Sequence, residues 1–565
     1  SAIILHLLEK EPDHRYQSAE GLVADLERVR DAPAHPGALR VGEHDVPLRL
    51  LPPSRLVGRD DEVVALKEAF EEALAGRCRG VLISGAPGVG KTALVDELRA
   101  VVTGRDGWFV AGKFDQYRRD IEFDAGYQAF RALGRLLLAE PEDALVRLRE
   151  RILRAVGPNA GLLTAVVPEL AALLEVPPDP GNPLTAQARA QRGAVGMLRA
   201  VASRKRPAVV FLDDLQWAGR TPLGVVDLVL SEEAVEGLLL VGAFRDGDVD
   251  AAHPLAGPLS RWRDQAGVRQ LRLDNLPGSG LVTMVAEMLH VDPAPAAGLA
   301  ELIHPRTSGN PYETVELLNA LRRNRLLAAT AAGWGWDTTA VRAHLGGSEV
   351  AGLPAGRVEA LPAASRRVLE AMACLGGRVE PSLLQTATAT PAGGVQQALA
   401  PALQDALLVA ETREAVRFRH DRIREAILAG LDPPRRHALR LAMARRLGEV
   451  SGLFAVAAEQ YLPVADAVED PAERARVVRL LRRAADQAAL TGDYARVNAL
   501  LAGALQLIDP AQTATLITVR TGRHTALYSI GRLEEADEEY RSIERLCATA
   551  LQRADPTALQ VRSLT

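Results

Sequence analysis

Gly85-Ala-Pro-Gly-Val-Gly-Lys91-Thr92 is the most informative stretch of this chain. It follows the apolar run Val81–Ser84 and leads into Ala93–Leu98, so the expected order is strand, glycine-rich loop and helix. The spacing G-x-x-x-x-G-K-[ST] lets backbone N–H groups surround the phosphates of a nucleotide at a helix N-terminus. At three positions of this stretch, a Cβ atom would disfavour a positive φ angle or prevent the close approach of a phosphate oxygen. These positions are Gly85, Gly88 and Gly90.

Two side chains of this stretch are expected to serve the nucleotide directly. Lys91 would reach the β- and γ-phosphates, and the hydroxyl of Thr92 would hold Mg²⁺. The alternative is a glycine-rich turn that matches the spacing by chance. The strand before it and the helix after it favour a phosphate loop. The fold class that follows is an α/β P-loop NTPase, a parallel sheet with helices on both faces.

A second motif, Pro207-Ala-Val-Val-Phe-Leu-Asp213-Asp214, is an apolar run that ends in two carboxylates. Such a run is typical of a buried parallel strand, and open α/β sheets bind ligands at the carboxyl ends of their strands. We therefore expect Asp213 to complete the Mg²⁺ shell and Asp214 to orient an attacking water. The alternative is an Asp that caps the next helix.

A third strand candidate, Leu238–Phe244, is followed by Arg245, where a sensor of the γ-phosphate would lie. An arginine after a strand is equally common at a solvated loop end, so both interpretations stay open. The predicted catalytic residues of an ATPase are then Lys91, Asp213, Asp214 and Arg245.

The composition excludes several classes of protein. The net charge of -5 over 565 residues gives no overall field that would attract nucleic acid or an anionic membrane. The three cysteines lie far apart and form no CxxC pair, so neither a zinc site nor a disulfide framework is indicated. No signal peptide and no uncharged run of bilayer length is found. We expect a cytoplasmic protein of roughly three to five modules.

Strand candidates alternate with helical stretches from Leu56 to about Asp250, which predicts a parallel sheet. The candidates are Val81–Ser84, Trp108–Lys113, Val209–Asp213 and Leu238–Phe244. The helical stretch 125–206 exceeds a normal crossover and is expected to be an insertion. Residues 251–340 have a helical pattern, and a hairpin is expected over Leu408–Phe418.

Amphipathic helices are predicted throughout the chain beyond residue 433. Two of them begin alike, with Gly492-Asp-Tyr-Ala-Arg and Gly531-Arg-Leu-Glu-Glu-Ala536, at a spacing near that of tetratricopeptide-type repeats. Unrelated helical hairpins are the alternative.

With these motifs in place, the chain resembles the central part of large bacterial Ser/Thr kinase–ATPase signalling proteins, the multi-sensor signal-transduction multi-kinases. Their ATPase is of the AAA/P-loop type and of the STAND class, the signal-transduction ATPases with numerous domains. The resemblance covers almost the whole chain. The matching stretches are Leu56–Glu62, Gly112-Lys-Phe-Asp-Gln-Tyr117, Leu212–Trp217, Gly309-Asn-Pro311, Gly333–Asp337 and Arg419-His-Asp-Arg422.

The resemblance implies roles for four further residues. Val57 and Arg59 would lie against the adenine, and Pro311 would pack on it from a helical lid. His420 would contact the β-phosphate of bound ADP and hold a closed state. The alternative for this last stretch is structural, with Asp421 as the N-cap of the helix that follows.

The chain is expected to comprise five domains or domain parts and one linker. The first thirty residues resemble the end of a protein-kinase C-lobe, but none of the kinase catalytic residues is in this sequence, which we expect to be part of a longer chain. Two departures from the family pattern, Gly219 and Tyr312-Glu313, suggest slow hydrolysis. The expected limits are 1–30 kinase tail, 31–54 linker, 55–250 ATPase, 251–340 helical lid, 341–432 winged helix and 433–565 TPR-like repeats.

The leading hypothesis is therefore an ATPase, with ATP/ADP and Mg²⁺ as cofactors, that controls an attached kinase or its own assembly through a nucleotide-dependent switch. The helical repeats would bind protein partners. Two alternatives stay open. One is a DNA-binding regulator that uses the winged helix, although no clustered recognition helix is evident and nucleic acid is not an expected partner. The other is a scaffold with a structural nucleotide.

Overall fold

The computed structural model describes residues 2–9, 15–16, 19–31, 41–42, 45, 50–115, 125–179, 183–231, 235–330, 333–347, 353–412, 415–490, 492–549, 553–554 and 557. Most of the expected linker 31–54 lies outside these residues, as do Gln116 and Tyr117 of a matched motif. The chain divides into two compact units. Unit 1 comprises Ser1–Lys67, Ser84–Glu97 and Leu271–Ala360, and unit 2 comprises Glu68–Ile83, Leu98–Gln270 and Leu361–Thr565.

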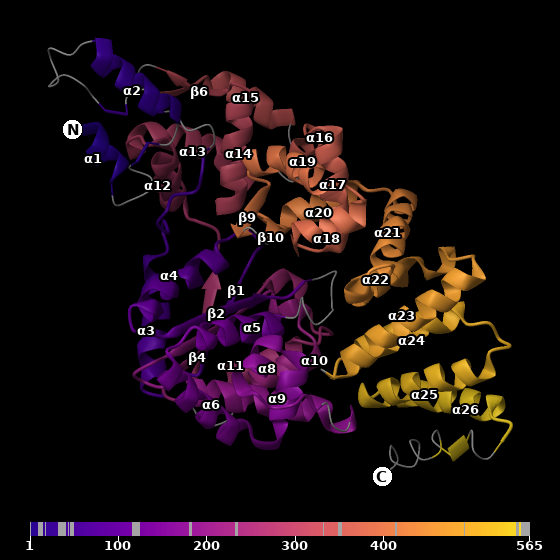
Figure 1. Ribbon diagram of the computed structural model, residues 1–565. Helices are drawn as coiled ribbons and strands as arrows, with labels where there is room; N and C mark the ends of the chain where they lie inside the picture. The colour runs from indigo at the N-terminus through magenta and orange to yellow at the C-terminus, as the bar shows by residue number, and fades with distance from the viewer. Residues whose placement is uncertain are drawn as a thin grey trace. The chain divides into compact units, whose positions relative to one another are not determined.

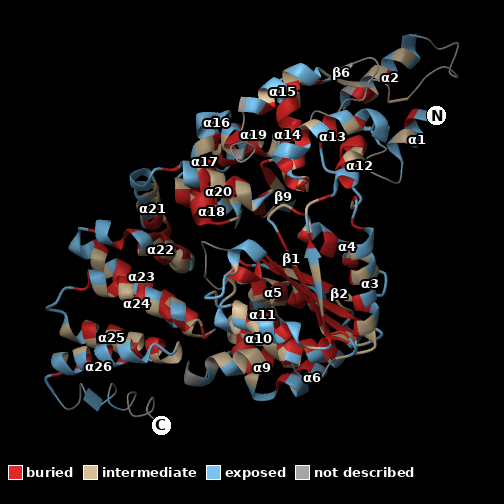
Figure 2. Ribbon diagram, turned by 180° about the vertical axis from the view of Figure 1, so that it is seen from behind, coloured by how far each residue is buried: buried red, intermediate tan, exposed pale blue. Residues whose placement is uncertain are grey.

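A five-stranded parallel sheet belongs mainly to unit 2, although the ends of β1 and β5 are assigned to unit 1. Its strands β1, β2 and β4 are labelled in Figure 1. The strand order is β2-β3-β4-β1-β5. All six residues of β3 and all seven of β4 are buried, as expected of parallel strands covered on both faces (Figure 2). The bounds are β1 Gly80–Gly85, β2 Trp108–Lys113, β3 Ala208–Asp213, β4 Leu238–Phe244 and β5 Val268–Leu273.

The predicted α/β fold class is confirmed, and all four strand candidates are strands. The fifth strand, β5, was not predicted and lies beyond the expected limit of 250, in a stretch expected to be helical. The reason is its pattern: Val268 and Leu273 are buried, whereas the residues between them are polar or partly exposed. Such a strand lacks the continuous apolar run that marked the other four.

Helices flank the sheet, and five of them fill the stretch expected to be a helical insertion. Leu133, Leu198 and Val226 of these surrounding helices belong to one apolar cluster with Val210, Leu212 and Leu240 of the strands. The bounds are α3 Asp60–Leu74, α4 Lys91–Thr103, α5 Ala125–Leu138, α6 Glu142–Val156, α7 Ala160–Val166, α8 Pro168–Leu174, α9 Pro183–Val201, α10 Arg220–Ser231 and α11 Ala256–Arg263.

Unit 1 contains a second apolar core, built mainly by helices of residues 278–347. Leu50, which lies within the expected linker 31–54, is fully buried in this core. Its backbone N–H donates to Asn319 Oδ1 at 3.0 Å, and its carbonyl accepts from Asn319 Nδ2 at 2.7 Å. The bounds are α1 Ala2–Leu7, α2 Ala19–Asp31, α12 Gly278–Leu289, α13 Pro293–Thr307, α14 Pro311–Arg323, β6 Leu327–Thr330, β7 Gly333–Trp336, α15 Thr338–Gly347 and α16 Leu353–Glu359.

Residues 363–430 of unit 2, hereafter the three-stranded module, combine four helices with an antiparallel sheet of order β8-β10-β9. The hairpin expected over Leu408–Phe418 is confirmed by the pairing of β9 with β10. The winged helix expected within residues 341–432 stays a prediction. The bounds are α17 Ala363–Leu375, β8 Arg378–Val379, α18 Pro381–Thr388, α19 Ala392–Gln404, β9 Leu408–Thr412, β10 Ala415–Phe418 and α20 Asp421–Gly430.

The rest of unit 2 is helical, and consecutive helices from α23 to α26 pack on one another as hairpins (Figure 1). Gly492 and Gly531 adopt left-handed φ angles of 70° and 79° just before α24 and α26. In the described part of the chain, no helix is long and apolar enough to cross a membrane. The bounds are α21 Pro433–Gly448, α22 Phe454–Tyr461, α23 Pro471–Leu490, α24 Tyr494–Leu507, α25 Thr513–Ser529 and α26 Leu533–Leu546.

Gly112 provides a test of the packing around β2. A Cβ at this position would lie 1.9 Å from the carbonyl oxygen of Ala125, a backbone atom that cannot turn away. We expect Gly112→Ala to destabilise the sheet region of unit 2 by about 1–3 kcal/mol and to lower its midpoint temperature in scanning calorimetry. The control is Gly219→Ala, whose Cβ would meet no atom within 4 Å. An unchanged midpoint in Gly112→Ala would contradict the close packing of β2 on α5.

Candidate active site

The phosphate loop of unit 1 forms a cradle around the ammonium group of Lys91. Gly85, Gly88 and Gly90 all have positive φ angles, of 152°, 81° and 105°. Lys91 is the first residue of α4 and is buried, and its Nζ donates to the carbonyl oxygens of Gly85 at 2.8 Å and Ala86 at 3.0 Å. A Cβ on Gly90 would meet no atom within 4 Å. The loop therefore has the conformation and the open side that a phosphate group needs.

The motif Gly309-Asn-Pro311 places the N-terminus of α14 on this loop. Asn310 Nδ2 donates to the carbonyl oxygen of Pro87 at 3.1 Å. The backbone N–H of Tyr312 donates to the carbonyl oxygen of Gly88 at 3.3 Å. Asn310 is also the N-cap of α14, because its Oδ1 accepts from the N–H of Glu313. Pro311 is thereby held next to the loop, and its expected packing on adenine stays a prediction.

Arg59 approaches the loop from another segment of unit 1. The Arg59 guanidinium is buried, and its Nη2 donates to the carbonyl oxygens of Val89 at 3.3 Å and Asp274 at 2.5 Å. Val57 is buried in the apolar cluster of the same unit. Thr92, the second residue of α4, is exposed. Unit 1 thus brings the expected adenine side of the site together with the phosphate loop.

In unit 2, the carboxylates of Asp213 and Asp214 close the end of β3. Both residues are buried, and Asp214 has a left-handed φ of 56°. The N–H of Asp214 donates to Asp213 Oδ1 at 3.0 Å, and Gln216 Nε2 donates to Asp214 Oδ1 at 2.9 Å. Two buried carboxylates at one place require compensating cations.

Lys113 supplies one of these cations, and the sequence analysis assigned it no role. It ends β2, in parallel register with Asp213. Its Nζ lies 2.6 Å from Asp214 Oδ2, 3.4 Å from Asp213 Oδ2 and 2.9 Å from Asp421 Oδ2. An ammonium group has three N–H donors, so three carboxylates can share them all. The third, Asp421, comes from α20 of the three-stranded module.

Arg245 supplies the second cation, at the position predicted after β4. Its Nε lies 3.3 Å from Asp214 Oδ1, its Nη2 3.3 Å from Asp421 Oδ2 and its Nη1 3.2 Å from Glu425 Oε1. We call the group Lys113, Asp213, Asp214, Gln216, Arg245, Asp421 and Glu425 the carboxylate network. We call the observed arrangement, in which Asp421 and Glu425 of α20 pair with Lys113 and Arg245, the latched form.

The network changes the acidity of its members. Burial alone would raise the pKa of Asp214, but the charges of Lys113 and Arg245 outweigh it and hold that pKa well below its usual range. Burial opposes the charged form of Lys113, yet the attraction of Asp213, Asp421 and Asp214 raises its pKa well above the ordinary value. Asp214 is therefore ionised with both oxygens engaged. In the latched form it is a weak base.

A second ion pair links the module to the segment after β2. Arg424 Nη1 lies 2.5 Å from Asp115 Oδ2, and the same oxygen accepts from the N–H of Gly377 at 3.2 Å. Arg424 Nε donates to the carbonyl of Ala373 at 2.9 Å. Both charged side chains are largely buried, with 5% and 11% of their surface exposed.

His420 is exposed and occupies the N-cap position of α20. The alternative that Asp421 caps this helix is wrong: Asp421 is the first helical residue, and its carboxylate pairs with Lys113 and Arg245. Sequence reasoning missed the pairing of Lys113 with Asp421. The available signal was that both residues lie in stretches that the resemblance had matched, Gly112–Tyr117 and Arg419–Arg422.

The oxygen ligands expected for Mg²⁺, the hydroxyl of Thr92 and the carboxylate of Asp213, are of the hard type that this ion prefers. The environment of Asp213 fits a cation, because an ammonium group already lies beside it. Among the described residues, no cluster of three or more His, Cys, Asp or Glu side chains could hold a metal by itself. Mg²⁺ in such sites takes one or two protein ligands and relies on phosphates and water for the others.

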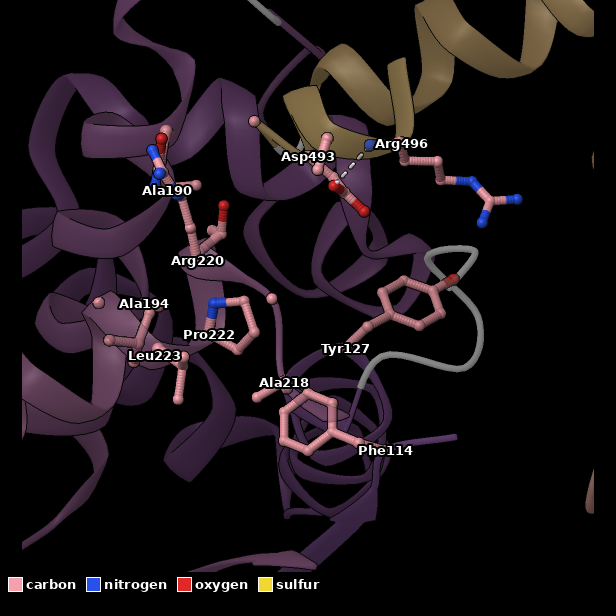
Figure 3. Close-up of a pocket in the computed structure, with 18 of the residues that line it drawn as sticks. Phe114, Tyr127, Ala190, Ala194, Ala218, Arg220, Pro222, Leu223, Asp493 and Arg496 are labelled. Atoms are coloured by element: carbon pink, nitrogen blue, oxygen red, sulfur yellow. Dashed lines mark hydrogen bonds between the residues drawn. The ribbon is translucent and has the colours of Figure 1, made fainter. Parts of the chain in front are cut away.

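A cavity of about 870 Å³ lies in unit 2 between the helices beside the sheet and the C-terminal helices (Figure 3). Phe114, Tyr127 and Pro222 line one side of it, and Asp493 lies opposite them. Asp115 also lines the cavity, which therefore reaches the second ion pair.

Residues 55–241 match the family model of the AAA ATPase domain. This range contains the phosphate loop and the carboxylate strand, and the match confirms the predicted resemblance to AAA/P-loop ATPases.

Among curated proteins, the chain is similar to the hybrid signal transduction histidine kinase G of Dictyostelium discoideum, with 22% identity over 476 residues. The match covers 68% of this chain and 14% of the length of that kinase. Among solved structures, the chain is similar to a Signal Transduction ATPase with Numerous Domains (STAND) protein with a tetratricopeptide repeat sensor from Pyrococcus horikoshii. The identity is 12%, the coverage 92% of this chain and 69% of that one, and the TM-score 0.44. Cdc6p from Pyrobaculum aerophilum is similar at 13% identity, with 68% and 97% coverage and a TM-score of 0.31.

The Asp115–Arg424 pair yields a prediction about stability. Arg424→Met would leave the largely buried Asp115 without its guanidinium, so we expect a loss of about 3–5 kcal/mol from the three-stranded module and its contact. The double variant Asp115→Asn/Arg424→Met should recover part of this loss. Thermal unfolding of both single variants and the double variant completes the cycle. Strictly additive effects would show that the two side chains do not interact.

Proposed function

We propose that this chain is a nucleotide-switched ATPase of a signalling protein, in which ADP holds a closed form and ATP favours an open one. The AAA ATPase domain supports nucleotide binding. The observation that carries the switch is the carboxylate network, because Asp214 and Arg245 pair directly with the charged groups of Lys113, Asp421 and Glu425.

In this proposal, the residues of the phosphate loop bind the nucleotide, with Lys91 on its β- and γ-phosphates. Thr92 and Asp213 would hold Mg²⁺, which when bound neutralises phosphate charge. Asp214 would orient the attacking water, and Arg245 would stabilise charge on the γ-phosphate. Both side chains are engaged in the latched form. Hydrolysis would therefore require the module to move first, which is a physical reason for slow turnover.

The signal would arrive through the C-terminal helices, whose stacked hairpins offer a surface for protein partners. Opening of the module would then control a kinase in the same chain or nucleotide-dependent self-association. A nucleotide can drive this change only through different affinities for the two forms. The similarity to a signalling histidine kinase, of which the chain spans 14%, is compatible with such a role.

The nucleotide that co-purifies with the protein tests the switch. We expect wild type to retain ADP, and His420→Ala to lose it or to carry ATP instead, because the histidine is proposed to contact the β-phosphate of ADP. Denaturation followed by ion-exchange chromatography identifies the nucleotide. His437→Ala, a change on α21, is the matched control. An empty wild-type site that still binds added ATP would indicate an ordinary exchanging ATPase.

Binding and hydrolysis should separate in a second pair of variants. Lys91→Ala is expected to weaken ADP and ATP binding by about 10- to 100-fold, the effect of one lost charged hydrogen bond. Asp214→Asn is expected to keep binding but to slow turnover by about 100-fold or more. Calorimetry and phosphate release measure the two effects. Unchanged turnover in Asp214→Asn would instead favour a scaffold with a structural nucleotide.

A further inference from the structure

Lys113 occupies a position between two parts of unit 2. Its single ammonium group lies within 3.4 Å of two carboxylates at the end of β3 and 2.9 Å from the carboxylate of Asp421 at the start of α20. The parallel register of β2 and β3 fixes its place beside Asp213, the residue expected to bind a divalent cation. The side chain as a whole is 45% exposed, although its ammonium group is enclosed by the three carboxylates.

We propose that Lys113 is a positioning residue that competes with the divalent cation. In the latched form its ammonium group compensates Asp213 and Asp214, and the same group holds Asp421. A divalent cation that binds Asp213 and Asp214 then displaces the ammonium group, and this displacement releases Asp421 and α20. This inference rests on the proposed nucleotide switch and names the residue that couples it to the metal.

The charges of the network favour such an exchange. Among the described residues, the carboxylates of Asp213, Asp214, Asp421 and Glu425 lie beside two cations, Lys113 and Arg245, and a fifth carboxylate, of Asp248, lies 3.9 Å from Arg245. If the ammonium group leaves, Arg245 still pairs with Asp214, Asp421 and Glu425, but Asp213 and Asp214 lose their shared ammonium partner, and the site gains affinity for an incoming cation. A divalent cation and an ammonium group at the same carboxylates would also repel each other. The two are therefore alternative occupants.

A purely structural role for Lys113 makes a different prediction. In that case, its loss would destabilise the fold without changing the affinity for metal. If instead the ammonium group and the metal exclude each other, the coupling is reciprocal. The Lys113–Asp421 contact then weakens metal binding by the same factor by which bound metal weakens that contact. Metal affinity, measured without turnover, therefore separates the two roles.

The test is the affinity of the ADP-loaded protein for Mn²⁺, followed by the electron paramagnetic resonance signal of free Mn²⁺. We expect Lys113→Met to bind Mn²⁺ about tenfold or more tightly than wild type, within the range typical of such couplings. Lys205→Met, which removes an exposed lysine of the same unit, is the matched control and should behave as wild type.

Asp421→Asn tests the competition if Lys113→Met does not fold. This variant keeps the ammonium group of Lys113 beside the buried carboxylates of Asp213 and Asp214. Loss of the Asp421 charge should weaken the hold on Lys113 and raise Mn²⁺ affinity by a smaller factor. If wild type binds ADP but both variants bind Mn²⁺ no more tightly than wild type does, the role proposed for Lys113 is overturned and the proposed function is not. A wild type that binds no ADP would overturn the proposed function as well.

Discussion

The burial of two adjacent carboxylates at the end of β3 is the constraint that the rest of unit 2 satisfies. Asp213 and Asp214 are 5% and 4% exposed, and an ionised carboxylate is tolerated there only with cations or donors beside it. The parallel register of β2 provides Lys113, and the end of β4 provides Arg245. These two cations in turn attract the acidic side chains of α20. The sheet topology thus determines where the three-stranded module is held.

Much of the fold could be predicted, and the exceptions have a physical reason. Four strands are apolar runs, and residues 408–418 have a polar centre between two mainly apolar ends, so local sequence was sufficient. β5 escaped prediction because its burial alternates, with polar residues between Val268 and Leu273. The phosphate loop could be predicted because one contiguous stretch carries its glycines and its lysine. The chemistry of that part of the site is local in sequence.

The carboxylate network could not be predicted, because its pairs join residues that are far apart in the chain. Lys113 and Asp421 each lie in a stretch that resembled the kinase–ATPase family, yet nothing local indicates that they meet. The expectation for Asp421 failed for the same reason. A local rule favours an aspartate as an N-cap, but Lys113 and Arg245 attract its carboxylate more strongly than backbone N–H groups do. Tertiary electrostatics overrode a local preference.

The two links between the ATPase part and the module differ in kind, and this difference bears on how the module could move. The Asp115–Arg424 pair is balanced in charge and largely buried, so an ion that arrives in solution has little effect on it. The Lys113–Asp421 contact is half-exposed, with 45% and 37% of the side chains accessible, and belongs to a network with surplus negative charge. Salt screens such a contact, and a cation can replace it. The first link is therefore suited to act as a pivot, and the second as the contact that responds to nucleotide and metal.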